Sequence, residues 1–106
     1  MAAPSSEVEG TLSRKEQRRL AAEARQAQSR LKREVQQQVK VLEDEIAALE
    51  AREKELVAEL ESPATYAERG RAVEINRELA ELHERLPGLH TAWEEAATRL
   101  LELGEG

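Results

Sequence analysis

The feature that most constrains the fold is a long stretch, residues 12–61, that contains neither glycine nor proline. Apolar side chains recur through it at steps of three and four residues, the spacing that places them on one stripe of an α-helix. Ser13 followed by Glu16 fits a capping box, which predicts the start of the helix at residue 13. Pro63 predicts its end, so we expect a first helix over about residues 13–61.

The same spacing returns in the last third of the chain. Through residues 71–103 the apolar steps alternate between four and three, which predicts a second helix there and a turn over residues 62–70. Pro87-Gly88 lies inside this helix, and the proline removes one backbone hydrogen bond. Because the step from Leu86 to Leu89 keeps the apolar phase, we expect a kink rather than two separate helices.

One antiparallel register pairs the two stripes. In an antiparallel hairpin the numbers of facing residues add to a constant, and four apolar pairs all add to 131. These pairs are Leu56 with Ile75, Leu49 with Leu82, Leu42 with Leu89, and Val35 with Ala96. The sequence therefore predicts an all-α fold, an antiparallel two-helix coiled-coil hairpin over residues 13–104. The second helix is too short to cover residues 13–27, which we expect to form an N-terminal helical overhang.

The sequence shows no sign of secretion or membrane insertion. Residues 1–12 contain Pro4 and Gly10 and are expected to form a disordered linker. The N-terminus lacks the basic-then-apolar order of a signal peptide, and no apolar run reaches membrane-spanning length. We therefore expect a soluble cytoplasmic monomer without membrane contact.

Charge is distributed unevenly along the chain. Residues 12–40 contain nine Lys or Arg against three Glu, a net charge of +6, whereas residues 41–106 contain seven Lys or Arg against seventeen Asp or Glu, a net charge of −10. The basic side chains cover the side of the first helix opposite its apolar stripe, at about 100° per residue. We take them as candidate nucleic-acid-binding residues: Arg14, Lys15, Arg18, Arg19, Arg25, Arg30, Lys32, Arg33 and Lys40.

Three segments resemble a known family. They are LSRKEQRRLAAEARQ at Leu12–Gln26, LEDEIAALEAREKELVAELESPATY at Leu42–Tyr66, and AWEEAATRLLEL at Ala92–Leu103. In that order they resemble the C-terminal domain of ABC-F proteins, the tandem ATP-binding-cassette ATPases. The resemblance implies an antiparallel coiled-coil hairpin that follows the second ATPase cassette and is implicated in nucleic-acid binding, with DNA for some members and the ribosome for others. Pro87-Gly88 and the acidic hairpin depart from the family pattern.

Catalysis by this chain is not expected. The glycines form no GxxxxGK[ST] phosphate loop, and an open two-helix surface offers no concave, partly dry site. We expect no cofactor, and the ATPase cassettes of the resemblance would lie outside this chain. His83 and His90 are too far apart to chelate one metal ion and are interpreted as surface residues. Trp93 is interpreted as a packing residue, and Glu53 as a register device or a partly hydrated position within the apolar stripe.

Three functions remain as hypotheses. The first is a non-catalytic accessory domain that binds DNA or ribosomal RNA through the basic helix and positions an ABC-F ATPase. The second is a protein-facing coiled coil that docks on the ATPase cassettes of the same polypeptide and regulates them. The third is a leucine-zipper transcription factor, which would leave the second helix without a role and lacks an Asn in its basic region to read bases.

Overall fold

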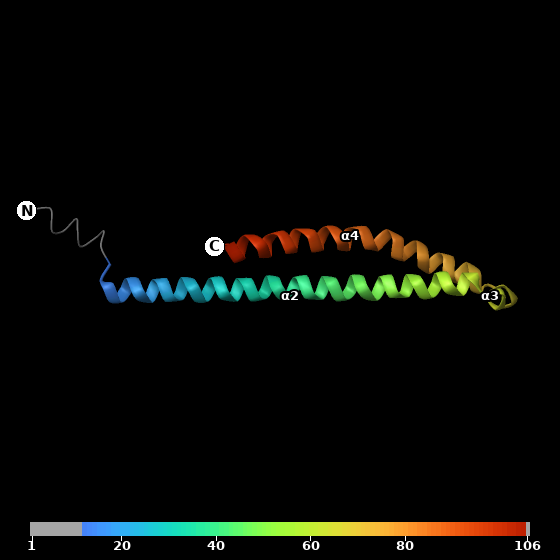
Figure 1. The fold of residues 1–106 in the computed structure, drawn as a ribbon, viewed down its shortest axis with the longest axis horizontal. Helices are drawn as coiled ribbons and strands as arrows, with labels where there is room; N and C mark the ends of the chain where they lie inside the picture. Colours follow the sequence, from blue (N-terminus) through green and yellow to red (C-terminus); the bar gives the residue numbers. More distant parts are fainter. Residues whose placement is uncertain (1–11, 106) are drawn as a thin grey trace, which may run out of the picture. The chain divides into compact units, whose positions relative to one another are not determined.

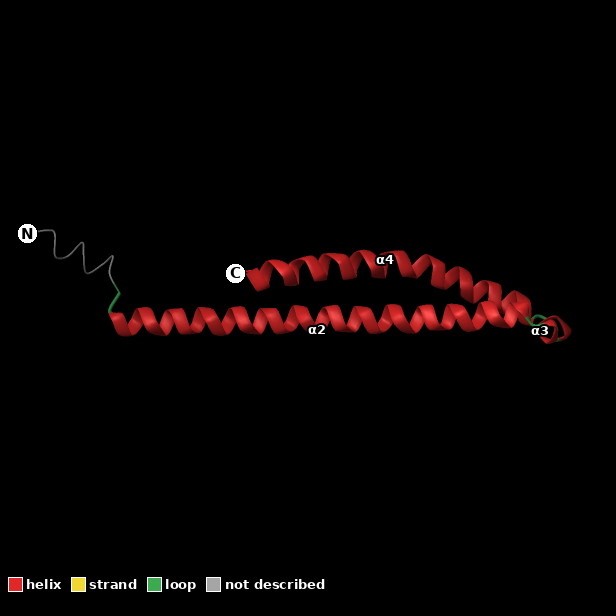
Figure 2. Ribbon diagram, viewed as in Figure 1, coloured by secondary structure: helices red, strands yellow, loops and turns green. Residues whose placement is uncertain are grey.

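The computed structural model describes residues 12–105 and contains three helices: α2 (Arg14–Glu61), α3 (Pro63–Ala67) and α4 (Arg71–Glu105). No strand occurs within this range, and the ribbon is helical almost throughout (Figures 1 and 2). The all-α class is therefore confirmed. The linker expected at residues 1–12 lies outside the described residues except for its last member.

The chain divides into two structural units, Met1–Glu34 and Val35–Gly106. We call the described part of the first unit, residues 12–34, the basic arm, and the second unit the hairpin. Helix α2 contributes its first 21 residues to the basic arm and continues into the hairpin, where α3 and α4 complete the fold.

The basic arm begins with the predicted cap. The backbone amide of Glu16 donates a hydrogen bond of 3.1 Å to the Ser13 hydroxyl, which satisfies one of the amides that the first helical turn leaves open. The side-chain amide of Gln17 donates to the Leu12 carbonyl at 3.1 Å. These two bonds explain why α2 begins at Arg14, directly after the capping serine.

The hairpin buries the stripes that the spacing predicts. Leu56 and Ile75 are almost completely buried, at 0% and 1% exposure, and form one cluster with Leu79 and Leu82. Further along, the buried apolar side chains are Val35, Val39, Ile46 and Ala96. Every one of these residues occupies a position on the predicted stripes, so the helical hairpin is confirmed. Its core is a narrow seam between two helices.

Three ion pairs fix the register of the seam. Arg52 pairs with Glu78 at 2.6 Å, and Arg71 pairs with Glu59 at 2.7 Å. Arg85 pairs with Glu45 in the same manner. The pairs recur every seven residues on each helix, and their residue numbers all add to 130. A single antiparallel register therefore extends along the hairpin, as the apolar pairs predicted.

The turn contains the short helix α3, which follows Ser62 and has Pro63 at its start, the position that proline favours in a helix. Thr65 is buried at 7% exposure, and its hydroxyl donates to the carbonyl of Glu59. The Tyr66 hydroxyl donates to the carbonyl of Leu60 at 2.7 Å. Both bonds use carbonyls that the end of α2 leaves without helical partners. Gly70 then adopts a φ of +81°, a conformation that favours glycine, before α4 begins.

Helix α4 includes Pro87 and continues to Glu105, past the end expected at Leu103. The ribbon of α4 is curved along its length (Figure 1). Gly104 therefore lies inside the helix rather than ending it. Glycine disfavours helix by only about 1 kcal/mol relative to alanine, so this position does not force a stop.

Candidate nucleic-acid interface

The nine candidate cations all lie on α2. Eight of them, from Arg14 to Arg33, belong to the basic arm, and Lys40 belongs to the hairpin. All are exposed except Lys32, which is half-buried. Residues 12–30 are all exposed except Ala22, so the stripe of Leu20, Ala24 and Ala27 is exposed as well.

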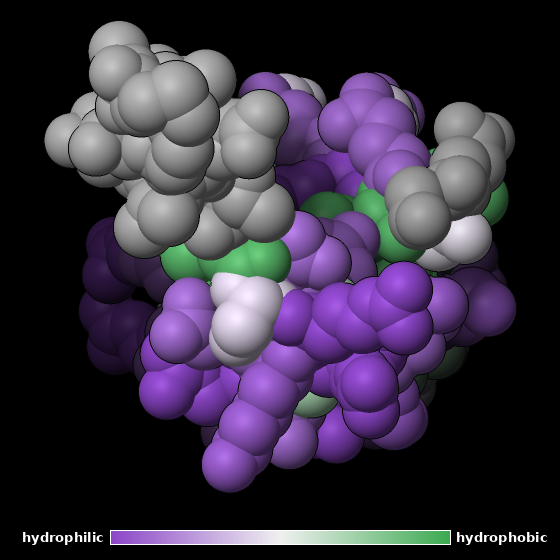
Figure 3. Space-filling view, turned by 90° about the vertical axis from the view of Figure 1, so that its left-hand side faces the viewer, coloured by the Kyte–Doolittle hydropathy of each residue, from purple (hydrophilic) through white to green (hydrophobic). Residues whose placement is uncertain are grey.

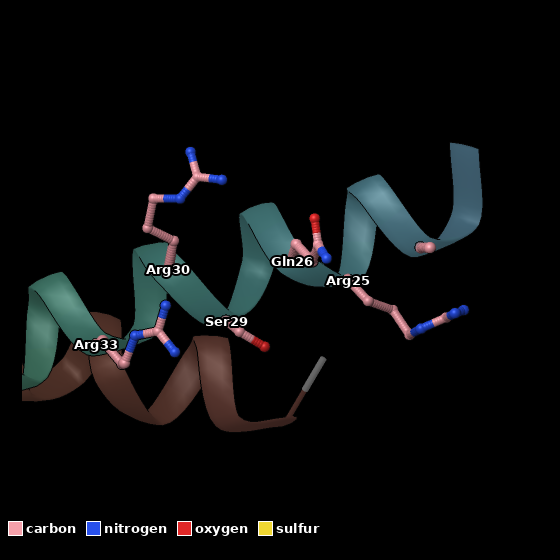
Figure 4. Close-up of a pocket in the computed structure, with 6 residues that line it drawn as sticks. Arg25, Gln26, Ser29, Arg30 and Arg33 are labelled. Atoms are coloured by element: carbon pink, nitrogen blue, oxygen red, sulfur yellow. The ribbon is translucent and has the colours of Figure 1, made fainter. Parts of the chain in front are cut away.

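Part of this set gathers around one shallow hollow. Arg25, Arg30 and Arg33 border it, together with Gln26 and Ser29. Figure 4 shows that the side chains of Arg25 and Arg30 leave the helix in different directions and end in open space. An open surface of this kind cannot enclose a small molecule, whereas it can lie against an extended anion.

Most cations of the basic arm have no acidic partner among the side chains that the structure describes. Arg19 is 3.9 Å from Glu23, and Lys40 bonds to Asp44 at 2.8 Å, which raises the pKa of Lys40. For the other candidates, no carboxylate among the described side chains lies within ion-pair distance. These seven are Arg14, Lys15, Arg18, Arg25, Arg30, Lys32 and Arg33. Their charges are therefore available to an anion from outside the chain.

The three inter-helix pairs Arg52–Glu78, Arg71–Glu59 and Arg85–Glu45 form an Arg–Glu ladder, and its arginines differ in this respect. The hydrogen bonds that Arg52 donates to Glu78 and Glu55 raise the pKa of Arg52, and those that Arg71 donates to Glu59 raise the pKa of Arg71. In return, the hydrogen bond from Arg52 lowers the pKa of Glu78. These groups cross-link α2 and α4 and do not add to an anion-binding surface.

Besides the three Arg–Glu pairs, the sequence analysis missed a polar contact between His83 and Glu53. The Nε2 atom of His83 lies 2.6 Å from the Oε2 atom of Glu53, and the two side chains are 60% and 32% exposed. Glu53 is therefore a partly hydrated position with a partner on α4. The register could have indicated it, because Glu53 faces Leu79 and His83 follows one helical turn later.

Within the described residues, no group of three or more His, Asp or Glu side chains could hold a metal ion. Over the same range, no helix is both long and apolar enough to cross a membrane. Viewed end-on from the side where α2 begins, the described surface is mainly hydrophilic, with small hydrophobic patches (Figure 3).

Comparison with known proteins places the hairpin in a family. The family model described as the ABC transporter C-terminal domain matches residues 30–98. No curated protein matches the chain, and no solved structure matches it. Of the candidate cations, Arg30, Lys32, Arg33 and Lys40 fall inside the matched range. Since the match covers most of the chain and agrees with the ABC-F resemblance of its sequence, this protein belongs to the family of ABC transporter C-terminal domains.

Proposed function

We propose that this chain is a non-catalytic accessory domain of an ABC-F ATPase that binds nucleic acid through its basic arm and positions the ATPase. One observation carries the proposal: seven exposed or half-exposed cations lie on one helix without an acidic partner among the described side chains. In this proposal the partner ATPase cassettes belong to the same polypeptide, and the protein acts in the cytoplasm.

The chemistry supports contact with a phosphate backbone. Arginine and lysine neutralise phosphates and release condensed counterions, so binding weakens steeply as salt rises. The basic arm contains no Asn, its one described hollow is shallow and open, and its Gln side chains lie beside arginines, so the contacts favour charge over base sequence. Such a domain would tether the ATPase to DNA or ribosomal RNA without choosing a sequence.

The position of the cations in the chain is also informative. Five of the nine candidates precede residue 30, where the family match begins. The hairpin that the family model covers is acidic, with a net charge of −10 over residues 41–106 from seven basic and seventeen acidic side chains. Nucleic-acid contact is therefore proposed for the arm alone.

The test is fluorescence anisotropy of labelled duplex DNA, single-stranded DNA and structured RNA at several salt concentrations. The variant Arg14→Glu/Arg18→Glu/Arg25→Glu/Lys32→Glu is compared with wild type. A matched control reverses four hairpin cations that have no ion pair among the described residues: Lys54→Glu/Arg69→Glu/Arg77→Glu/Arg99→Glu. Both variants change the net charge equally.

We expect micromolar binding at low salt, a loss of at least about tenfold between 50 and 200 mM salt for four or more phosphate contacts, and loss of binding in the arm variant only. The ranking of the three ligands identifies the preferred nucleic acid. Equal loss in both variants would reduce the effect to net charge and contradict an arm-specific site.

A second candidate is docking of the arm on the ATPase cassettes. It is favoured by Leu20, an apolar side chain of the arm stripe that is 43% exposed. Absence of binding to every nucleic acid at low salt, with an intact helical spectrum, would leave this function as the better account of the arm.

A further inference from the structure

The two long edges of the hairpin differ in chemistry. One edge carries the Arg–Glu ladder that includes Arg52 and Glu78. Glu43 and Glu50 lie two residues before Glu45 and Arg52, about 200° around α2, and therefore on another side of that helix. Neither Glu43 nor Glu50 has an ion-pair partner among the described side chains. This second edge therefore carries two carboxylates that are not held in ion pairs, with Lys40 and Lys54 before and after them on the same side of α2.

A recess opens between α2 and α4 along this edge. Its lining combines Glu43, Ile46, Ala47 and Glu50 of α2 with His90 and Trp93 of α4, and its volume is about 270 Å³. Ile46 is buried in the seam, and the indole N–H of Trp93 is buried without a hydrogen-bond partner. The recess therefore has an apolar part and two carboxylates.

The arrangement of these groups selects a cationic occupant. Glu43 and Glu50 are seven residues apart, about 10 Å along the helix, with Ala47 between them. A long basic side chain can lay its methylene groups on apolar surface while its charge stays beside a carboxylate. An arginine or lysine near Trp93 also gains from the electron-rich indole face. The occupant that fits is a basic helix with a small apolar stripe.

The chain itself supplies such a helix. The basic arm has a stripe of Leu20, Ala24 and Ala27, all exposed. Arg30 lies three residues beyond Ala27 and about 60° from it around the helix, beside the apolar stripe. From this position an arginine can reach a carboxylate of a helix that packs on the stripe. Charge complementarity holds for the segments as a whole, since residues 12–40 carry +6 (nine basic, three acidic) and residues 41–106 carry −10 (seven basic, seventeen acidic).

We propose that the recess at Glu43, Glu50 and Trp93 binds the basic arm of a second copy of this chain. Each copy has one arm and one recess, so two reciprocal contacts close a dimer. The proposal replaces the monomer expected from the sequence. It does not depend on nucleic-acid binding, and its tests use protein freed of nucleic acid.

The first test is sedimentation equilibrium of the full chain at 50 and 500 mM NaCl. We expect a monomer–dimer equilibrium that weakens at least about tenfold at the higher salt, because the contact is electrostatic in part. Glu43→Lys/Glu50→Lys should weaken it at least about tenfold further. Glu84→Lys/Glu95→Lys, an equal charge change at exposed positions of α4, should alter it less than about twofold. A monomer at every concentration in low salt would overturn the proposal.

The second test locates the contact. The chain contains no cysteine, so single cysteines can be placed freely. A mixture of Ala27→Cys and Ala47→Cys chains should form a disulfide between copies on mild oxidation. The control Ala51→Cys lies one helical turn beyond Ala47, is equally exposed, and is outside the recess. Equal cross-linking at both positions, or cross-linking only between identical variants as in a parallel zipper, would refute the arm-in-recess contact.

Discussion

Truncation of Leu56 tests whether the seam supplies the stability of the hairpin. Leu56 has 0% exposure and packs in the cluster that contains Ile75, Leu79 and Leu82. Leu→Ala substitutions in protein cores cost about 2–5 kcal/mol, and the cost is lower where neighbours can relax. A two-helix seam is open on its edges, so we expect about 2–3 kcal/mol for Leu56→Ala. At about 4–8 °C per kcal/mol for a domain of this size, Tm should fall by about 10–20 °C.

The assay is thermal and urea unfolding followed by circular dichroism at 222 nm. The matched control is Val41→Ala, which truncates an aliphatic side chain of the same helix that is 51% exposed. Because alanine is the better helix former and little apolar burial is lost, we expect a change below about 0.5 kcal/mol. If Leu56→Ala and Val41→Ala shifted Tm equally, the helices would not derive their stability from the seam, and the hairpin reasoning would fail.

Two further substitutions test the ladder and the proline. The hydrogen bond from Arg52 lowers the pKa of Glu78 in the folded state. The contribution of this pair to stability is therefore complete above the ordinary glutamate pKa of about 4.3. It is lost as the pH falls through the lowered pKa of folded Glu78. Glu78→Gln should therefore lower Tm at pH 7, and the difference from wild type should shrink toward pH 3 in thermal melts; an equal difference at both pH values would contradict the pairing. Pro87→Ala restores a backbone donor inside α4 and should raise Tm in the same assay, since a mid-helix proline costs about 3 kcal/mol relative to alanine. A fall in Tm would mean that the packing of α4 requires the proline.

The seam could be predicted from the sequence because it depends on periodicity alone. Apolar steps of three and four residues identified the buried positions, such as Val35 and Ile75, and the constant sum of facing numbers identified the antiparallel register. The cap at Ser13 was equally readable, since it depends on two residues three apart. These signals are local or strictly periodic, and a single sequence contains them in full.

The polar partners of the hairpin could not be predicted in the same way. The register brings His83 near Glu53 and Arg71 near Glu59, but whether these side chains pair depends on which rotamers reach across the seam. Many charged side chains compete at the edges, and the sequence does not rank them. The recess beside Trp93 is a property of how tightly two helices approach, which spacing does not report.

The arginines of the hairpin are held in ion pairs and most cations of the arm are not, which explains why the candidate site lies on the arm. In the hairpin, Arg52, Arg71 and Arg85 are held by carboxylates of the opposite helix, so they stabilise the register and are withdrawn from outside partners. Seven cations of the arm have no carboxylate among the described side chains within ion-pair distance. The same residue types therefore have a structural role in one segment and are available for binding in the other. Whether the anion that binds them is a phosphate backbone or the acidic recess of a second copy is decided by competition. If both proposals hold, added nucleic acid should dissociate the dimer in sedimentation, and a dimer that persists at saturating nucleic acid would show that the two use different faces of the arm.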